Sequence, residues 1–311
     1  MNILIIGASG FVGQNVKKVF SSSKEFNLFF SSYSLGVDLI DYAQTEALLK
    51  KTAPDYIINC AAHVGSLNYV TEKAANVMLD NSRMLLNMYE AVSKICPKAI
   101  IINPIANCAY PAKADTFIED FWMEGHLHRS VLSYGSTRRL LWSIAESFYM
   151  QHAIKTINLF VPNMYGPYDS PDPNKAHALD ALISKFVKAQ KENIKEIEIW
   201  GTGVAIREWL YAEDFGKIIL QVISEKNIMG LSEPINIGQN FGLSVRELVE
   251  IIQNHFDNKF IIKWNHNMPD GAPKKVMDDR KFRKVFPDFK FTDFNTGIEQ
   301  TINYYNAIYP Y

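Results

Sequence analysis

The sequence predicts an α/β fold built on a parallel, doubly wound sheet with a smaller C-terminal lobe. Two observations support this prediction. Short apolar runs alternate with helical patterns through the first half of the 311-residue chain, which is the order that a parallel sheet with crossover helices requires. In addition, the first apolar run, Ile3–Ile6, is followed at once by glycines at positions 7, 10 and 13.

These glycines lie between an expected strand and an expected helix. Gly7 permits a tight turn, Gly10 lets a pyrophosphate approach the backbone, and Gly13 lets the helix pack close to the sheet. The free N–H groups at the start of a helix favour phosphates. A glycine-rich turn without a ligand would have the same composition, but its place between strand and helix favours a Rossmann-type dinucleotide site. The residues assigned to the turn are Gly7, Ser9, Gly10, Phe11, Val12 and Gly13.

The remaining elements of this half follow in chain order. Runs of four to six mostly apolar residues predict strands, and longer segments with apolar residues three to four apart predict helices. The expected strands are Ile3–Ile6, Asn27–Phe30, Tyr56–Ala61, Ala99–Ile102 and Thr156–Phe160. The expected helices are Gln14–Phe20, about Ala74–Ile95 and Gly135–His152.

The character of the chain changes after Gly166-Pro167. The segment Asp169–Lys175 is rich in Pro, Asp and Asn, which predicts a loop. We therefore expect a dinucleotide-binding domain over residues 1–165 with about 210–238. Residues 166–209 and 239–311 are expected to form the smaller, substrate-binding lobe.

Composition limits the classes of partner. Hydrophobic residues make up 48% of the chain, charged residues 21%, and the net charge is −1. Because there is no basic excess, neither a nucleic acid nor a membrane surface is an expected partner. The three cysteines have no metal-ligand spacing, so we expect no metal, and their odd number fits a reducing cytoplasm. No apolar run is long enough to span a bilayer, and the N-terminus lacks the features of a signal peptide.

One tyrosine is a candidate for proton transfer. Tyr134 and Arg138 lie four residues apart, on one face of the expected helix. A nearby positive charge lowers the pKa of a phenol, which would let Tyr134 exchange a proton near neutral pH. An ordinary buried tyrosine beside a surface arginine has the same spacing, which alone favours that plainer interpretation. Asn107 and Cys108 follow the fourth strand, and loops at the carboxyl ends of strands line the ligand crevice of such sheets. We therefore expect Asn107, Cys108 and Tyr134 to converge.

Further segments complete a family pattern. They are Ala61–Gly65, Cys108–Pro111, Asn163–Pro167, His177, Trp200–Gly203, Arg207-Glu208, Ile235–Gly238 and 269–275. With the three glycines and Tyr134, they make the chain resemble, almost from end to end, the extended short-chain dehydrogenases/reductases. Within them it is most similar to the GDP-L-fucose synthases, which are GDP-4-keto-6-deoxymannose 3,5-epimerase/4-reductases. The Cys108 segment, His177 and residues 269–275 together indicate the GDP-sugar group.

The resemblance implies a role for each matching residue. Tyr134 would exchange a proton at the sugar C4 oxygen while a nicotinamide moves hydride at C4, with Arg138 and Asn107 beside it. Cys108 and His177 match the pair that moves protons at C3 and C5, although a buried thiol and a solvated loop histidine are the plainer alternatives. The GDP-sugar would contact Cys108, Asn163, Lys185, Trp200, Arg207, Asp270 and Lys274. Besides the glycine turn, the nicotinamide cofactor would contact Ser32, Asp38, Ala61, Ala62, Asn81, Pro104, Ile105, Ala106, Tyr134, Arg138, Val161, Asn163, Met164 and His177.

The chain departs from the family pattern at four positions. Arg138 replaces the usual lysine, and Ala106 replaces the serine that hydrogen-bonds the reacting oxygen, a role that the adjacent Asn107 could fill. Ser9 and Ser32 replace two arginines that bind the 2′-phosphate of NADP. Since no acidic residue ends the second strand, as NAD sites prefer, the resemblance favours NADP(H) and leaves NAD open.

Three functions remain open on the sequence. The first is a reductase of a GDP-4-keto-6-deoxy hexose or heptose, with or without C3/C5 epimerisation. The second is an NAD-dependent C4 dehydrogenase or epimerase of a GDP-sugar, and the third is a sugar-nucleotide-binding protein that has lost efficient catalysis. Relatives pair through helices near residues 82–95 and 135–152, so the resemblance also implies a homodimer.

Overall fold

A six-stranded parallel sheet forms the centre of the protein. The computed structural model describes residues 1–311 except 115, 173–174, 226–232, 258 and 269. The strand order is β10-β5-β4-β3-β1-β2, and every neighbouring pair is parallel. The strands are β1 (Asn2–Ile6), β2 (Asn27–Ser31), β3 (Tyr56–Asn59), β4 (Ile100–Ala106), β5 (Thr156–Val161) and β10 (Ile235–Asn236). The predicted α/β class is confirmed.

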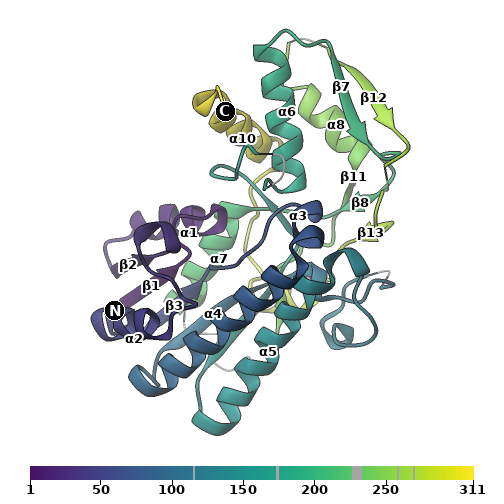
Figure 1. Ribbon diagram of the computed structural model, residues 1–311. Helices are drawn as coiled ribbons and strands as arrows, with labels where there is room; N and C mark the ends of the chain where they lie inside the picture. Colours follow the sequence, from purple (N-terminus) through teal and green to yellow (C-terminus); the bar gives the residue numbers. More distant parts are fainter. Residues whose placement is uncertain (115, 173–174, 226–232, 258, 269) are drawn as a thin grey trace.

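Helices cover both faces of this sheet (Figure 1). On one face lie α1 (Phe11–Ser21) and α7 (Ala212–Glu225), and on the other α2 (Tyr42–Thr52), α4 (Ala74–Ile95) and α5 (Leu132–His152). Side chains of a strand alternate between faces. Ile3 and Ile5 accordingly pack with α1 and α7, whereas Leu4 and Ile6 pack with α4 and α5. Because both faces of β1 are buried, its sequence is apolar without interruption.

The expected elements are present, with shifted ends. The helix predicted over Gln14–Phe20 begins at Phe11, because Gly10 caps it with extended backbone. The strand predicted to end at Ala61 ends at Asn59, and the one predicted to end at Ile102 continues to Ala106 because its pairing with β5 extends that far. The helix expected from Gly135 begins at Leu132, which places Tyr134 inside its first turn.

The C-terminal half adds smaller sheets and a separate apolar cluster. These sheets pair β6 (Asn163–Tyr165) with β9 (Trp209–Tyr211), β7 (Glu196–Trp200) with β12 (Ile261–Asn265), and β8 (Ile206–Arg207) with β11 (Leu243–Ser244) and β13 (Lys274–Lys275). Helices α6 (Ala178–Lys191), α8 (Val245–Gln253) and α10 (Phe294–Ile308) contribute to that cluster. Phe282 of α9 (Arg280–Val285) and Phe286, the residue after this helix, pack instead in the apolar cluster on the central sheet. Among the helices of the described residues, none has the length and apolarity to cross a bilayer.

The predicted loop over residues 169–175 also has a defined place. Its described part consists of turns and irregular backbone and leads into α6, while residues 173–174 lie outside the described part. Asp169 in this loop is buried, and its carboxylate accepts the backbone N–H of His177 at 2.7 Å. The loop therefore fixes the start of α6 and the position of His177.

Candidate active site

The glycine turn lies at the carboxyl end of β1, beside the first residues after β3. Gly7 has φ of 76°, and a Cβ on it would stand 2.6 Å from the backbone of Cys60 and Ala61. A Cβ on Gly13 would stand 2.1 Å from the Gly7 carbonyl oxygen, so only glycine lets α1 approach this closely. A Cβ on Gly10 would meet only that oxygen, at 3.3 Å. The turn thus leaves open space at Gly10, next to the N–H groups that begin α1, and fits a pyrophosphate.

Three serine hydroxyls meet where the turn approaches the end of β2. Ser9 donates to Ser32 at 2.8 Å, and Ser34 donates to Ser9 at 2.7 Å. The Ser32 and Ser34 hydroxyls are 3.2 Å apart. Ser34, on the short helix η1 (Tyr33–Leu35), was not foreseen from the sequence. At the place where an acidic residue or an arginine usually selects the cofactor, this chain therefore presents neutral hydroxyl groups.

Tyr134 and Arg138 lie on one face of α5, as their spacing predicts. The Arg138 guanidinium carbon is 4.9 Å from the centre of the Tyr134 ring. Arg138 is 3% exposed and donates to the Asn81 side-chain oxygen at 3.2 Å. Asn81 is itself fixed, because its amide donates to the carbonyls of His63 and Val77. Arg138 is thus held at a set position against the face of the phenol ring.

The pKa of Tyr134 differs in direction from the sequence expectation. Burial raises the pKa of the phenol above its ordinary value, while Arg138 lowers it and Cys108 raises it further. The expectation that the arginine lowers the pKa overall is wrong, because desolvation outweighs the charge. At neutral pH the phenol is therefore protonated and able to donate.

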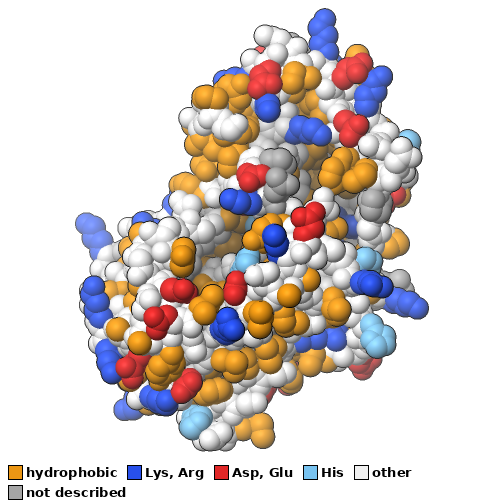
Figure 2. Space-filling model, in the orientation of Figure 1, with side chains coloured by type: hydrophobic (Ala, Val, Ile, Leu, Met, Phe, Trp, Pro, Cys, Tyr) orange, Lys and Arg blue, Asp and Glu red, His pale blue; other side chains and the backbone are white. Residues whose placement is uncertain are grey.

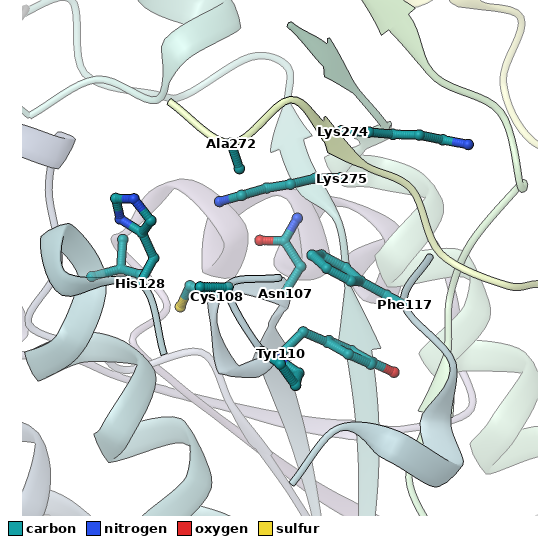
Figure 3. A pocket seen from close by; sticks show the side chains of 11 residues that line it. Asn107, Cys108, Tyr110, Phe117, His128, Ala272, Lys274 and Lys275 are labelled. Carbon is teal, nitrogen blue, oxygen red and sulfur yellow. The ribbon is translucent and has the colours of Figure 1, made fainter. Parts of the chain in front are cut away.

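Asn107 and Cys108 line a small pocket immediately after β4 (Figure 3). Gly135 of α5 lets this turn come close, since a Cβ there would stand 2.6 Å from the Cys108 carbonyl oxygen. Figure 3 shows the Asn107 amide pointing into the pocket toward the end of Lys275. The predicted convergence with Tyr134 agrees with the electrostatic influence of Cys108 on that phenol.

The Cys108 thiol is neutral at physiological pH. Burial raises its pKa to about 11, although Lys275 and Arg138 act in the opposite direction. Burial in turn lowers the pKa of Lys275. The sequence analysis predicted Lys274 as a contact to the substrate, and this lysine is exposed at the pocket. Its neighbour Lys275 is half-buried and interacts electrostatically with Cys108.

His177 occupies a different place from the Cys108 pocket. It caps α6, its Nδ1 lies 3.1 Å from the Asp169 carboxylate, and its ring centre lies 5.2 Å from that of Phe11. The described residues that line the pocket include His128 but not His177. His177 thus stands beside the dinucleotide turn, in keeping with its expected contact to a cofactor.

The residues expected to hold the nucleotide lie on α6, on β7 and β8, and on the segment between β12 and β13. Trp200 is 53% exposed, and the Lys185 ammonium donates to the Glu198 carbonyl. The Asp270 carboxylate accepts from the backbone and hydroxyl of Thr202, both at 2.7 Å, and its carbonyl accepts from Arg207 at 3.1 Å. Asp270 thus fixes the turn after Trp200. Residue 269 of the same motif lies outside the described part.

Most of the other expected cofactor contacts lie at, or within a few residues after, the carboxyl ends of strands of the central sheet. Ala61 and Ala62 follow β3, and the ends of β4 and β5 lie in register, Ala106 opposite Val161. The Asn163 amide donates to the Glu208 carbonyl at 3.3 Å, which joins β6 to the segment before β9. Asp38 accepts the N–H of Ile40 at 2.9 Å. The residues placed along the edge are Gly7, Ser9, Gly10, Ser32, Asp38, Ala61, Ala62, Pro104, Ile105, Ala106, Val161, Asn163 and Met164.

Comparison with known proteins agrees with this geometry. The model of the NAD dependent epimerase/dehydratase family matches residues 3–238. GDP-L-colitose synthase of Yersinia pseudotuberculosis is 27% identical over 307 residues, covering 98% of each protein. A GDP-L-fucose synthetase from Naegleria fowleri bound to NADP has a TM-score of 0.83 at 23% identity, covering 99% of this chain and 93% of that one. The GDP-mannoheptose C4 reductase of Campylobacter jejuni with NADP bound has a TM-score of 0.83 at 21% identity, covering 97% of each.

The two structural likenesses show the shared fold, and the family model shows a shared sequence pattern over residues 3–238. The matched range includes the glycine turn, Asn81, Cys108, Tyr134 and Arg138. Because it spans most of the 311 residues, this chain belongs to the NAD dependent epimerase/dehydratase family.

Proposed function

We propose that this protein reduces the C4 ketone of a GDP-linked 4-keto-6-deoxy hexose or heptose, with NADPH as the reductant. The observation that carries the proposal is the position of the Tyr134 phenol, against the buried Arg138 guanidinium and within electrostatic reach of Cys108, which follows β4 of the sheet whose first strand leads into the glycine turn. The names of the relatives, which include a GDP-colitose synthase and a GDP-mannoheptose C4 reductase, support a GDP-sugar as substrate.

The residues of this chain supply binding and proton transfer. The N–H groups at the start of α1 would hold the pyrophosphate of a nicotinamide dinucleotide, which when bound would supply hydride to the ketone carbon. Tyr134 donates its phenolic proton to the C4 oxygen as that oxygen gains negative charge. Arg138, held by Asn81, stabilises the tyrosinate that remains. The Asn107 amide provides the hydrogen bond to the C4 oxygen that Ala106 cannot give.

Burial keeps Tyr134 protonated, which is the state that the proton donor in a ketone reduction needs. The neutral Cys108 thiol likewise suits donation of a proton better than its removal. We also propose that any epimerisation at C3 and C5 uses Cys108 and His177 as its proton carriers.

The test is turnover with defined substrates. We expect the purified protein to oxidise NADPH when GDP-4-keto-6-deoxymannose is added, measured by the loss of absorbance at the nicotinamide band and by mass spectrometry of the product. GDP-mannose, which has no ketone, is the matched control and should give no oxidation. Tight binding of both sugars without any oxidation would reject the reductase and favour a sugar-nucleotide-binding protein.

The serine cluster leads to a prediction about the cofactor. Because Ser9, Ser32 and Ser34 carry no charge, we expect only modest preference for NADPH over NADH. Ser9 is exposed, so Ser9→Arg should fit and should improve the NADPH preference, measured as a ratio of dissociation constants, by about tenfold or more through a charge-assisted hydrogen bond to the 2′-phosphate. Ser34→Ala is the control, because it removes one hydroxyl group of the serine cluster without adding a charge. An unchanged ratio in Ser9→Arg would place the 2′-phosphate elsewhere.

We also propose that the protein is a cytoplasmic homodimer with the two-lobe division predicted above. Free cysteines at 60, 96 and 108 support a reducing compartment. Leu79 and Leu86 on α4 and Tyr149 and Met150 on α5 are about half exposed or more, and Figure 2 shows hydrophobic side chains gathered over these two helices. An apolar surface of this kind supports pairing with a second copy.

A further inference from the structure

The pocket beside Cys108 contains a histidine that the mechanism above does not use. His128 precedes the short helix η4 (Arg129–Val131) and lines the pocket together with Asn107, Cys108 and Lys275. Figure 3 shows the end of the Lys275 side chain pointing toward the His128 ring, with Cys108 and Asn107 below them. The other lining residues are Lys274 and the mostly apolar Tyr110, Pro111, Ala112, Phe117, Val131 and Ala272.

The local backbone determines which ring nitrogen of His128 faces outward. Its Nδ1 accepts the backbone N–H of Ser130 at 3.3 Å and lies 2.7 Å from the Ser130 hydroxyl. Ser130 is fixed in turn, since its carbonyl accepts from the Thr71 hydroxyl of α3 (Leu67–Glu72) at 3.0 Å. Because Nδ1 is an acceptor, the neutral ring carries its proton on Nε2. For this N–H, no protein acceptor exists among the described residues.

The position of the pocket indicates which part of a substrate would enter it. On one side are Cys108 and Tyr134, which are assigned to the reacting end of the sugar. On the other side Lys275 interacts electrostatically with Arg207, in the region assigned to the nucleotide. A sugar joined to a nucleoside diphosphate would therefore lie between these groups. The pocket has a volume of about 20 Å³, which is room for one substituent of a sugar and not for the ring, so an oxygen substituent of a sugar lying at its mouth would enter it.

We propose that His128 is a sugar-binding and specificity-determining residue, which donates its Nε2–H to an oxygen substituent of the hexose or heptose ring. The inference rests on the proposed function only for the class of ligand, a sugar nucleotide. His128 then acts with Lys275 and Asn107 to hold the sugar over Cys108 and Tyr134. Because this hydrogen bond is made to the sugar and not to the nucleotide, it does not strengthen the binding of GDP alone.

Two substitutions separate this role from the structural role of the same side chain. His128→Asn keeps an acceptor where Nδ1 caps η4 but removes the donor that faces the pocket. His128→Gln places an amide N–H near the position of Nε2 but loses the short-range cap. His126→Asn is the matched control, since His126 is an exposed histidine two residues away that does not line the pocket.

The measurement is the dissociation constant of GDP-mannose and of GDP by calorimetry, whose ratio reports the contribution of the sugar. We expect His128→Asn to reduce that ratio about tenfold, the effect of one lost hydrogen bond. His128→Gln and His126→Asn should retain it, and GDP should bind all variants alike. Two results would overturn the proposal. In the first, the wild type binds GDP-mannose no more tightly than GDP; in the second, His128→Asn keeps the wild-type ratio while His128→Gln loses it. If the variants show the expected ratios but the protein oxidises no NADPH, the reductase is rejected and His128 still contacts the sugar.

Discussion

Tyr134→Phe should lower kcat for NADPH-dependent ketone reduction by about 10²- to 10⁴-fold, the range typical of a lost general acid. The phenol is protonated at neutral pH, and a ketone oxygen that gains negative charge needs a proton donor within reach. Phenylalanine retains the ring over which Arg138 lies, so the packing of α5 is preserved. The variant therefore removes one hydroxyl group and little else.

Two further measurements make the result specific. Binding of NADPH, followed by the fluorescence of its nicotinamide, should change little in Tyr134→Phe, and so should the midpoint of urea unfolding. Tyr149→Phe is the matched control, because Tyr149 lies on the same helix and is half exposed, outside the pocket. A rate in Tyr134→Phe within a few-fold of the wild type would remove Tyr134 from the mechanism.

Residues whose environment is local could be placed from the sequence. The helix Ala74–Ile95 was predicted with the ends that the structure shows, because its apolar periodicity depends only on neighbouring turns. Tyr134 and Arg138 share a helix face for the same reason. The run at β1 predicted a strand buried on both faces, and Ile3 to Ile6 divide between the two core clusters.

Features that depend on tertiary contacts could not be placed. The neighbourhood of Cys108 brings together the turn after β4, the start of η4 and β13, and no spacing in the sequence relates these segments. His128 also lines this pocket, which nothing in the sequence around it indicated, whereas the role predicted for His177 stays a prediction. Lys274 and Lys275 form a strand of two residues, too short for its pattern to tell which side chain turns inward. The direction of the Tyr134 pKa shift also depends on burial, which the spacing to Arg138 does not reveal.

Gly13→Ala should damage both folding and cofactor binding. The added methyl group would stand 2.1 Å from the Gly7 carbonyl oxygen and 2.8 Å from the Ala8 Cα, both backbone atoms that no rotamer change can move. Helix α1 must then shift away from the turn, and overpacking of this kind costs about 1–3 kcal/mol, or more where backbone is involved. We expect a lower urea midpoint together with greatly weakened NADPH binding.

Gly10→Ala separates these two effects. Gly10 has φ of −79° and ψ of 170°, which alanine adopts readily, and its Cβ would meet only the Gly7 carbonyl oxygen, at 3.3 Å. The methyl group would instead project into the space assigned to the pyrophosphate. Stability should therefore stay near that of the wild type while the dissociation constant for NADPH rises by an order of magnitude or more. If Gly10→Ala bound NADPH normally, the dinucleotide would not lie against this turn, and the assignment of the glycine motif would be wrong even though Gly13 remains essential for packing.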